Sequence, residues 1–217
     1  MGEMTFTSKS EYVYKYLRDN IKSSRFETGK LYKIVDIAAE LGVSRTPVTE
    51  AIKLLVSQGY VILHPCVGFE VTGISQEQMQ EVFKIRAALE SLAIKEAILG
   101  CSEDDIGALE DILELCRKSV LEKNANEYSK NTEKFHFMLY GMAKMSRLSV
   151  ILQDLWLHEG WYLQALKCDS DEVKNLLFDH YEIIEVLKKR DYSAVEKLVE
   201  DHTRKCMEVL SQEVARA

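Results

Sequence analysis

Three of the five histidines lie in segments whose apolar residues recur at helical spacing, and together they could bind one metal ion. His180 and His202 each lie 11 residues from Asp191, where a turn between two helices is expected. Two antiparallel helices that rise about 1.5 Å per residue would return both side chains to the same height. His136 lies on an earlier expected helix. Three neutral imidazoles around one point can hold a divalent transition metal (Zn, Ni or Mn) and leave positions open for a ligand.

A run of helices is expected to position these histidines. From Gln76 onward the chain contains no proline, and residues such as Val82, Leu89 and Ala93 recur at helical spacing. The expected helices span residues 76–99, 103–122, 125–144, 146–165, 172–189 and 192–214. The sequence has no Gly-rich phosphate loop, no GxSxG motif and no alternating βα pattern. It therefore predicts an all-α helical bundle over residues 75–217.

A second pattern, from Ile34 to Gly59, predicts an element that reads DNA. A short apolar helix ends at Gly42, which suits the left-handed turn after a helix. Ser44 can then cap a second helix whose apolar residues are spaced by three and four. Such a helix-turn-helix presents the first residues of its second helix to base edges in the major groove. The residues expected to be exposed there are Ser44, Arg45, Thr46 and Thr49.

The residues after this second helix predict a hairpin, or wing. The expected strands are Tyr60–His64 and Phe69–Thr72, with a turn between them. An upstream amphipathic segment, residues 12–21, would complete a three-helix core, so residues 1–74 describe a winged helix-turn-helix domain. Further candidate contacts to DNA are Lys33, Lys53, His64 and Gly68.

The segment LGVSRTPVTEAIKLLVSQGYV, residues 41–61, resembles the GntR-family signature, in which LGVSRxPVREAL precedes a Leu-rich stretch and a Gly. The resemblance covers the whole chain and is to the FadR-like branch, whose winged helix is joined to a helical effector domain called FCD. That domain commonly carries D-x-x-F-H, a later His and another His 22 residues on. Phe135-His136 and the spacing of His180 and His202 match this pattern. The segment from Arg86 to Glu90 resembles the RxxLE start of the domain.

Three positions depart from the family pattern. Thr132 stands where an aspartate ligand is usual, so water or an effector carboxylate is expected to complete the metal site. Thr49 replaces the arginine of PVREAL, and Val35 stands where an arginine is frequent. Because arginine is the commonest bidentate reader of guanine, the operator is expected to differ from those of relatives that carry both arginines.

The candidate effector site contains Arg86, Thr132 and Tyr140. Arg86 could face inward and bind a carboxylate through its planar guanidinium, or it could form a surface ion pair with Glu90. Thr132 and Tyr140 lie one helical turn on either side of His136. A metal together with an arginine would favour a small hydroxy, keto or sugar acid, the class that the resemblance implies.

Other interpretations stay open. The histidines could be ordinary bundle residues around a metal-free pocket, or a hydrolytic metal centre. No bundle carboxylate is clearly placed as a general base and a winged helix has no role in such an enzyme, so we expect no enzyme. A winged helix that binds protein instead of DNA would agree with Thr49. Trp156, Trp161 and Tyr162 are typical of a core or a dimer interface, and His158 has no assigned role.

Charge and cysteine content agree with a cytoplasmic, DNA-binding regulator of transcription. Residues 1–75 carry nine Lys or Arg and eight Asp or Glu, so they hold +1 of a net charge of −7 and the remainder holds −8. This weak positive charge predicts that a homodimer is needed to engage two half-sites of double-stranded operator DNA. The five scattered cysteines form no CxxC pair, and no apolar run is long enough for a membrane. We expect a repressor that responds to a small carboxylate.

Overall fold

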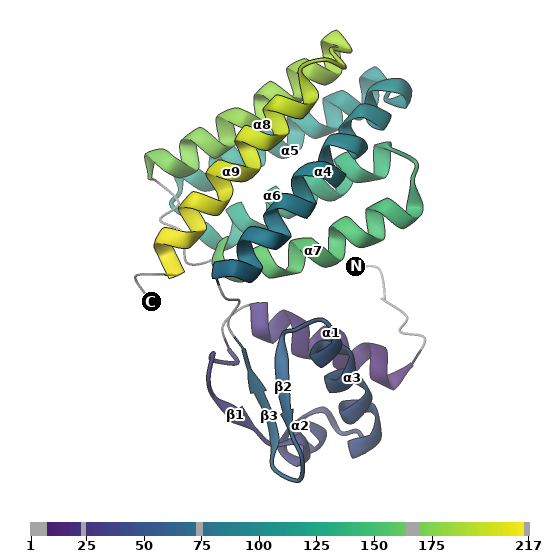
Figure 1. Cartoon of the computed structure of the whole chain (residues 1–217), viewed down its shortest axis with the longest axis vertical. Helices are drawn as coiled ribbons and strands as arrows, with labels where there is room; N and C mark the ends of the chain where they lie inside the picture. Colours follow the sequence, from purple (N-terminus) through teal and green to yellow (C-terminus); the bar gives the residue numbers. More distant parts are fainter. Residues whose placement is uncertain (1–7, 23–24, 73–75, 164–169, 215–217) are drawn as a thin grey trace. The chain divides into compact units, whose positions relative to one another are not determined.

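The computed structural model describes residues 8–22, 25–72, 76–163 and 170–214, with the backbone alone for residues 22, 76, 157–163 and 212–214. The chain forms two compact units, Met1–Ser75 and Gln76–Ala217. The first combines helices with a small sheet, and the second is helical (Figure 1). Within the described ranges, no helix is both long enough and apolar enough to cross a bilayer.

The N-terminal unit is a winged helix-turn-helix. Its elements are α1 (Lys9–Lys22), β1 (Leu31–Tyr32), α2 (Ile34–Leu41), α3 (Arg45–Ser57), β2 (Val61–His64) and β3 (Gly68–Val71). Helices α1 and α2 both pack against α3. The shared core contains the fully buried side chains of Val13, Leu17, Ile52 and Leu55. The predicted order of three helices and a hairpin is confirmed.

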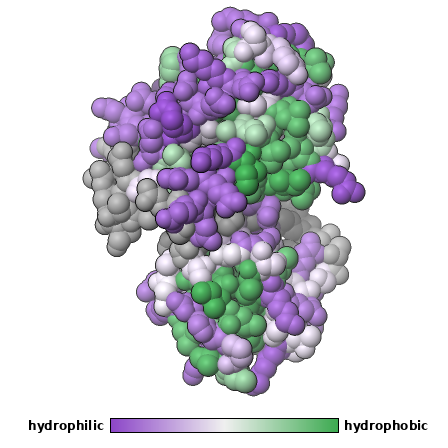
Figure 2. Space-filling view, viewed as in Figure 1, coloured by the Kyte–Doolittle hydropathy of each residue, from purple (hydrophilic) through white to green (hydrophobic). Residues whose placement is uncertain are grey.

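The wing is part of a three-stranded antiparallel sheet with strand order β1-β3-β2. The sequence analysis missed β1, because two residues are too few to show a strand pattern. Leu31 and Ile62 both pair with Glu70, so all three side chains share one face. Leu31 and Ile62 are exposed, and Figure 2 shows apolar surface over the sheet. The other face carries Phe69 and Val71, which are fully buried.

The turn before α3 sets the direction of the recognition helix. Gly42 ends α2 in the left-handed conformation with φ 63°, as predicted. Ser44 has the extended backbone of an N-cap residue, but its side chain makes no capping hydrogen bond, which corrects the sequence prediction. Pro47 lies in the first turn of α3, where a missing N–H breaks no helical hydrogen bond. The Ser44 hydroxyl is therefore not committed to the helix.

The C-terminal unit is a bundle of helices, as predicted. It consists of α4 (Gln76–Gly100), α5 (Glu103–Leu121), α6 (Ala125–Met142), α7 (Ser146–Leu163), α8 (Asp171–Lys189) and α9 (Val195–Val214). Figure 1 shows α8 and α9 side by side, and α4 packs against α6, α7 and α9. Ser102 and Asp105 form a reciprocal capping box at the start of α5. The core includes Leu109, Leu113, Phe135 and Leu139, all fully buried.

The turn between α8 and α9 is tied to the end of α4. Arg190 ends α8 in the left-handed conformation with φ 50°. Its guanidinium donates hydrogen bonds to the carbonyl oxygens of Ile98 and Cys101. Asp191 accepts backbone N–H bonds from the short turn before α9, so it caps that turn and not the helix itself. These contacts hold the turn in place and so help to set the register of α8 against α9.

Candidate functional site

Three buried histidines from three helices converge inside the bundle. His136 lies on α6, His180 on α8 and His202 on α9, and none is more than 2% exposed. One ligand atom from each lies within 4.8 Å of those of the other two. The Nε2 atoms of His136 and His180 are 3.1 Å apart. The ring centroids of His180 and His202 are 4.8 Å apart, so their equal distance from the α8–α9 turn does bring them to one height.

Burial keeps the rings of His136 and His180 uncharged. It lowers the pKa of both well below the ordinary value, and the charges of neighbouring imidazoles lower each pKa further. A neutral imidazole keeps the lone pair that a metal ion requires, whereas a protonated ring has lost it. The electrostatics of the cluster therefore favour the metal-binding form of these rings.

Hydrogen bonds around His136 indicate which nitrogen carries each proton. The Tyr140 hydroxyl donates to Glu90 Oε1 at 2.7 Å, so it accepts from His136 Nδ1, 3.4 Å away. The Nε2 atom of a neutral His136 then holds a lone pair, which accepts from Nε2–H of His180. Nδ1 of His180 is buried and has no hydrogen-bond partner among the described residues. Since buried polar atoms rarely lack a partner, the cluster is one polar contact short.

Asp179 fixes the orientation of His202. Nδ1 of His202 donates to Asp179 Oδ2 at 3.3 Å, and Lys205 donates to Oδ1 at 2.6 Å. Burial by itself raises the pKa of Asp179, but the hydrogen bonds from His202 and Lys205 outweigh it, and the pKa lies below its ordinary value. The ionised carboxylate holds the proton on Nδ1 and leaves Nε2 of His202 as the ligand atom, a pairing typical of metal-binding histidines.

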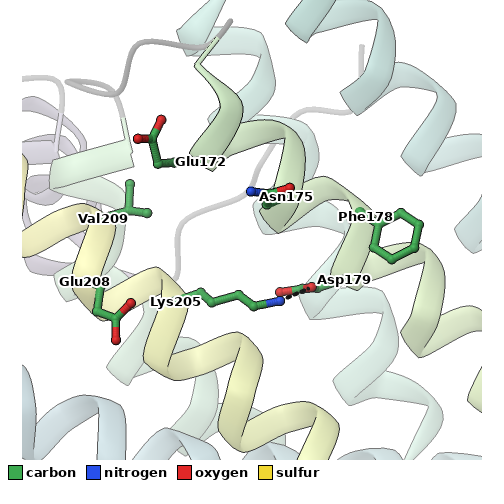
Figure 3. A pocket seen from close by; sticks show the side chains of 7 residues that line it. All are labelled: Glu172, Asn175, Phe178, Asp179, Lys205, Glu208 and Val209. Carbon is green, nitrogen blue, oxygen red and sulfur yellow. Dashed lines mark hydrogen bonds and ion pairs between the residues drawn. The ribbon is translucent and has the colours of Figure 1, made fainter.

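The sequence analysis missed Asp179. Its position directly before His180 places it about 100° round α8, and only the packing of α9 against α8 brings it to His202. A surface groove between α8 and α9 is lined by Asp179 and Lys205, whose ion pair is drawn in Figure 3. The groove has a volume of about 430 Å³ and is lined by Glu172, Asn175, Phe178, Asp179, Lys205, Glu208 and Val209. Lys205 is partly exposed and Asp179 is buried, so their ion pair lies between the groove and His202.

Arg86 reaches the same buried region and is paired there with an internal carboxylate. Its Nε and Nη2 atoms donate to Glu90 Oε1 at 2.9 and 2.7 Å, and the two side chains are 1% and 3% exposed. The sequence left two alternatives for Arg86, an inward orientation and a surface pair with Glu90. The structure shows both the inward orientation and the pair with Glu90, and this pair is buried, not at the surface. Burial by itself lowers the pKa of Arg86, but Glu90 raises it above its ordinary value. A bound carboxylate would compete with Glu90 for this guanidinium.

Trp156 on α7 covers this region. Its ring centroid lies 4.5 Å from that of His136, and the Arg86 guanidinium carbon lies 4.4 Å from the Trp156 ring. The side chain is 3% exposed, and its Nε1 donor has no hydrogen-bond partner in the part of the chain that the structure describes. Sequence reasoning assigned Trp156 to a core or an interface and did not connect it with the histidines. The side chains of His158, Trp161 and Tyr162 lie outside the described residues.

Thr132 and two cysteines adjoin the cluster. Thr132 is buried on the helix of His136, and its Oγ1 lies 3.9 Å from Sγ of Cys116 on α5. The Sγ atom of Cys206, one turn after His202 on α9, lies 3.6 Å from Nε2 of His202. Burial raises the pKa of the Cys206 thiol to about 12. Of the predicted effector residues, Arg86 and Tyr140 meet at Glu90, while the hydroxyl of Thr132 contacts Cys116.

The candidate DNA-contacting residues gather around a second groove, within the N-terminal unit. This groove has a volume of about 660 Å³ and lies between the starts of α2 and α3 and the wing. Its lining is Lys33, Ile34, Val35, Arg45, Thr49, Leu63, His64, Pro65, Cys66, Val67 and Gly68. Ser44, Thr46 and Lys53 do not line the groove but are exposed on or just before α3. Lys33 and Arg45 bring positive charge to the groove.

Three of the candidate DNA contacts have partners inside the protein. His64 Nε2 lies 2.8 Å from Glu70 Oε2 across the wing. The Thr49 hydroxyl donates to the carbonyl oxygen of Arg45 at 2.9 Å. Gly68 is buried, and a Cβ there would lie 2.1 Å from the carbonyl oxygen of Tyr32, so the close approach of β1 and β3 accounts for this glycine.

Comparisons with known proteins agree with this two-part organisation. The family model described as FCD domain matches residues 81–205, and the model described as bacterial regulatory proteins, gntR family, matches residues 9–71. The chain is 24% identical over 217 residues to the HTH-type transcriptional regulator McbR of Escherichia coli, covering 99% of this chain and 95% of that protein. It is 28% identical over 180 residues to the gluconate operon transcriptional repressor of Bacillus subtilis, covering 81% and 74%.

A solved structure shares the fold. The structure of E. coli McbR/YncC matches with a TM-score of 0.83 and 22% identity, over 96% of this chain and 100% of that chain.

The uncharged rings of His136 and His180 predict a pH-dependent stability of the metal-free protein. The unfolded chain takes up protons on these rings below about pH 6.5, whereas the folded rings resist protonation. The free energy of unfolding should be fully present above about pH 6.5. It should fall by up to about 1.4 kcal/mol per pH unit for each ring as the pH decreases towards the lowered pKa values. Urea unfolding at several pH values measures this slope. The variant His64→Gln changes a histidine outside the helical unit and should keep the slope, and a flat profile would contradict the assignment of neutral buried rings.

Proposed function

Since this chain belongs to the gntR family of bacterial regulatory proteins and carries an FCD domain, we propose that it is a ligand-responsive repressor whose helical unit holds a metal ion. The observation that carries the proposal is the convergence of His136, His180 and His202, three buried rings with ligand atoms within 4.8 Å. The relatives are described as regulators of transcription, one of them as a repressor. The domains we propose are residues 1–74 for DNA binding and 75–217 for effector binding and dimerisation.

The proposed DNA contacts are the exposed residues at the start of α3 and around the groove of the N-terminal unit. Arg45 and Thr46 are exposed in the first turn of α3, the part of a recognition helix that meets base edges. Lys33 and Lys53 are exposed and could neutralise phosphates. Val35 is 42% exposed in the same groove and offers no hydrogen bond to a base. These features support binding to double-stranded operator DNA with Arg45 as the principal base reader.

The residues fit a divalent transition metal held by three imidazoles. His136 has a lone pair on Nε2, and Asp179 orients His202 so that its Nε2 also carries a lone pair. His180 would move its proton from Nε2 to the unpartnered Nδ1. Such nitrogen ligands suit zinc or nickel better than magnesium or calcium, which take oxygen ligands. When bound, the metal would supply a Lewis-acidic position for an oxygen atom of the effector.

We propose a small organic acid as the effector. Its carboxylate could complete the metal coordination, since Thr132 replaces the carboxylate usual in the family. Trp156 Nε1 offers a buried donor for a second oxygen. Arg86 would contribute through its charge, or directly if the ligand displaced Glu90 from it. A ligand that gives side chains on α4 new hydrogen-bond partners acts on the helix that follows the DNA-binding unit in the chain. Such a ligand controls DNA affinity only if it binds two arrangements of the protein with different affinities.

An apolar stripe on α4 supports a homodimer formed by the helical units. Ile85, Leu92 and Leu99 recur every seven residues along α4, and they are 42%, 38% and 70% exposed. Val150 and Ile151 on α7, which packs against α4, are also exposed. Figure 2 shows apolar side chains gathered on this part of the helical unit. Exposed apolar surface of this extent is typical of a protein interface.

Arg45→Ala should weaken binding to operator DNA and reduce discrimination against altered sites by about 1–3 kcal/mol, because one bidentate base contact is lost. Gel-shift titration on genomic fragments that the wild-type protein selects measures both effects. Arg18→Ala is the control, since Arg18 lies on α1 and pairs with Asp19 outside the groove. Unchanged affinity and specificity in the Arg45 variant would exclude our placement of the recognition surface.

Protein without a polyhistidine tag should bind about one zinc or nickel ion per chain. His180→Ala should lose this ion, and Asp179→Asn should bind it about 10- to 100-fold more weakly, because the hydrogen bond that orients His202 is weakened. Isothermal titration and elemental analysis provide the measurements. The control His64→Ala changes a histidine in the other unit. Absence of a stoichiometric metal in the wild type would leave a metal-free effector pocket as the better description.

Leu99→Glu should shift the protein towards monomer, because a charge would enter the proposed apolar interface. Leu121→Glu is the matched control: Leu121 is 67% exposed at the end of α5, away from the α4 stripe. Sedimentation equilibrium of both variants measures the dimerisation constant. Equal behaviour of the two variants would place the interface elsewhere.

A further inference from the structure

Cys206 lies next to the histidine cluster and has no part in the three-histidine site described above. We propose that its thiolate is the fourth protein ligand of the metal, which makes the site His₃Cys. The inference rests on the proposed metal site and goes beyond it. Cys206 follows His202 by four residues on α9, so both side chains lie on one face of the helix. Its Sγ is 3.6 Å from Nε2 of His202, and the side chain is 5% exposed.

Two of the donor–donor distances are close to those around a tetrahedral ion, while the three histidine ligand atoms as a group lie within 4.8 Å of one another. Zinc binds imidazole nitrogen at about 2.0–2.1 Å and thiolate sulfur at about 2.3 Å, which places nitrogen and sulfur about 3.5–3.6 Å apart and two nitrogens about 3.3–3.4 Å apart. The observed distance from His202 Nε2 to Cys206 Sγ is 3.6 Å. The observed distance between His136 Nε2 and His180 Nε2 is 3.1 Å. Two edges of the required tetrahedron are therefore already close to their final lengths.

The position one turn before His136 on α6 offers no anionic ligand. Thr132 occupies the position one turn before His136, and its hydroxyl contacts Cys116 Sγ at 3.9 Å. A neutral hydroxyl is a poor metal ligand compared with a carboxylate or a thiolate. In this chain the anionic ligand would instead be a thiolate one turn after His202. Metal binding requires the Sγ–H bond of Cys206 to break, its proton to pass to solvent and the sulfur lone pair to bind the ion, with no change of oxidation state.

This ligand set has a consequence for metal choice. Three imidazoles and one thiolate favour zinc, whereas manganese prefers carboxylate, carbonyl and water ligands. A fourth protein ligand also fills a tetrahedral ion, so an effector would have to expand the coordination or displace a ligand. The metal would then chiefly organise α6, α8 and α9, and the effector would contact it only with a change in the ligand set.

Cobalt substitution of the full-length, untagged protein tests the proposal. Co²⁺ bound by a thiolate gives an intense sulfur-to-cobalt charge-transfer absorption in the near ultraviolet, and cobalt bound by imidazoles and water does not. The wild type should show this absorption, and Cys206→Ser should lose it and bind zinc at least about 10-fold more weakly. Cys116→Ser is the matched control, since Cys116 is also a buried cysteine near the cluster, and it should keep both properties.

A second variant separates a ligand role from a packing role. In the double variant Thr132→Asp with Cys206→Ser, the added carboxylate one turn before His136 should recover zinc affinity, whereas the thiolate absorption should stay absent. Cobalt binding by the wild type without thiolate absorption would overturn the Cys206 assignment and leave the three-histidine site intact. No cobalt or zinc binding by the wild type would overturn both. Loss of the absorption in Cys116→Ser but not in Cys206→Ser would identify Cys116 as the thiolate ligand and would also overturn the proposal.

Discussion

The burial of polar groups between helices is the constraint on which the helical unit depends. Arg86, Glu90 and Asp179 are almost fully buried together with the three imidazoles. A buried polar group without a partner costs about 1–3 kcal/mol, and removal of one member of a buried ion pair costs about 3–5 kcal/mol. The bundle meets this constraint by pairing Arg86 with Glu90 and His202 with Asp179. The His202–Asp179 pair joins α9 to α8, and the hydrogen bond from Tyr140 to Glu90 joins α6 to α4.

The same constraint makes the site responsive. The polar contacts of the cluster are almost complete. Trp156 Nε1 and His180 Nδ1 are buried without a hydrogen-bond partner among the described residues, so a ligand that pairs with either atom gains the most free energy. A ligand that binds Arg86 must compete with Glu90. Glu90 lies on the same helix as Arg86 and also accepts a hydrogen bond from Tyr140 on α6. A change in the hydrogen-bond partners of Glu90 therefore affects side chains on both α4 and α6. A network with few alternative pairings converts a small chemical change into a discrete rearrangement.

In the N-terminal unit, backbone geometry places the candidate DNA-contacting residues. Gly42 turns the chain between α2 and α3, and Gly68 lets β1 approach β3, so the first turn of α3 and the wing border one groove. Charge contributes little, since this unit carries a net +1. Recognition must then depend on a few well-placed side chains such as Arg45, because long-range attraction to phosphates is weak at this charge.

The sequence by itself determined the local structure and the register of the histidines. Apolar spacing fixed the helices, Gly42 fixed the turn before α3, and equal distances from the turn at Asp191 brought His180 and His202 to one height. It could not determine which side chains from other helices meet there. Asp179 and Trp156 join the cluster, the Arg86–Glu90 pair lies in the core, and Thr132 contacts Cys116 through the packing of helices distant in sequence. Helical periodicity specifies the face on which a residue lies, whereas the packing of helices decides what that face meets.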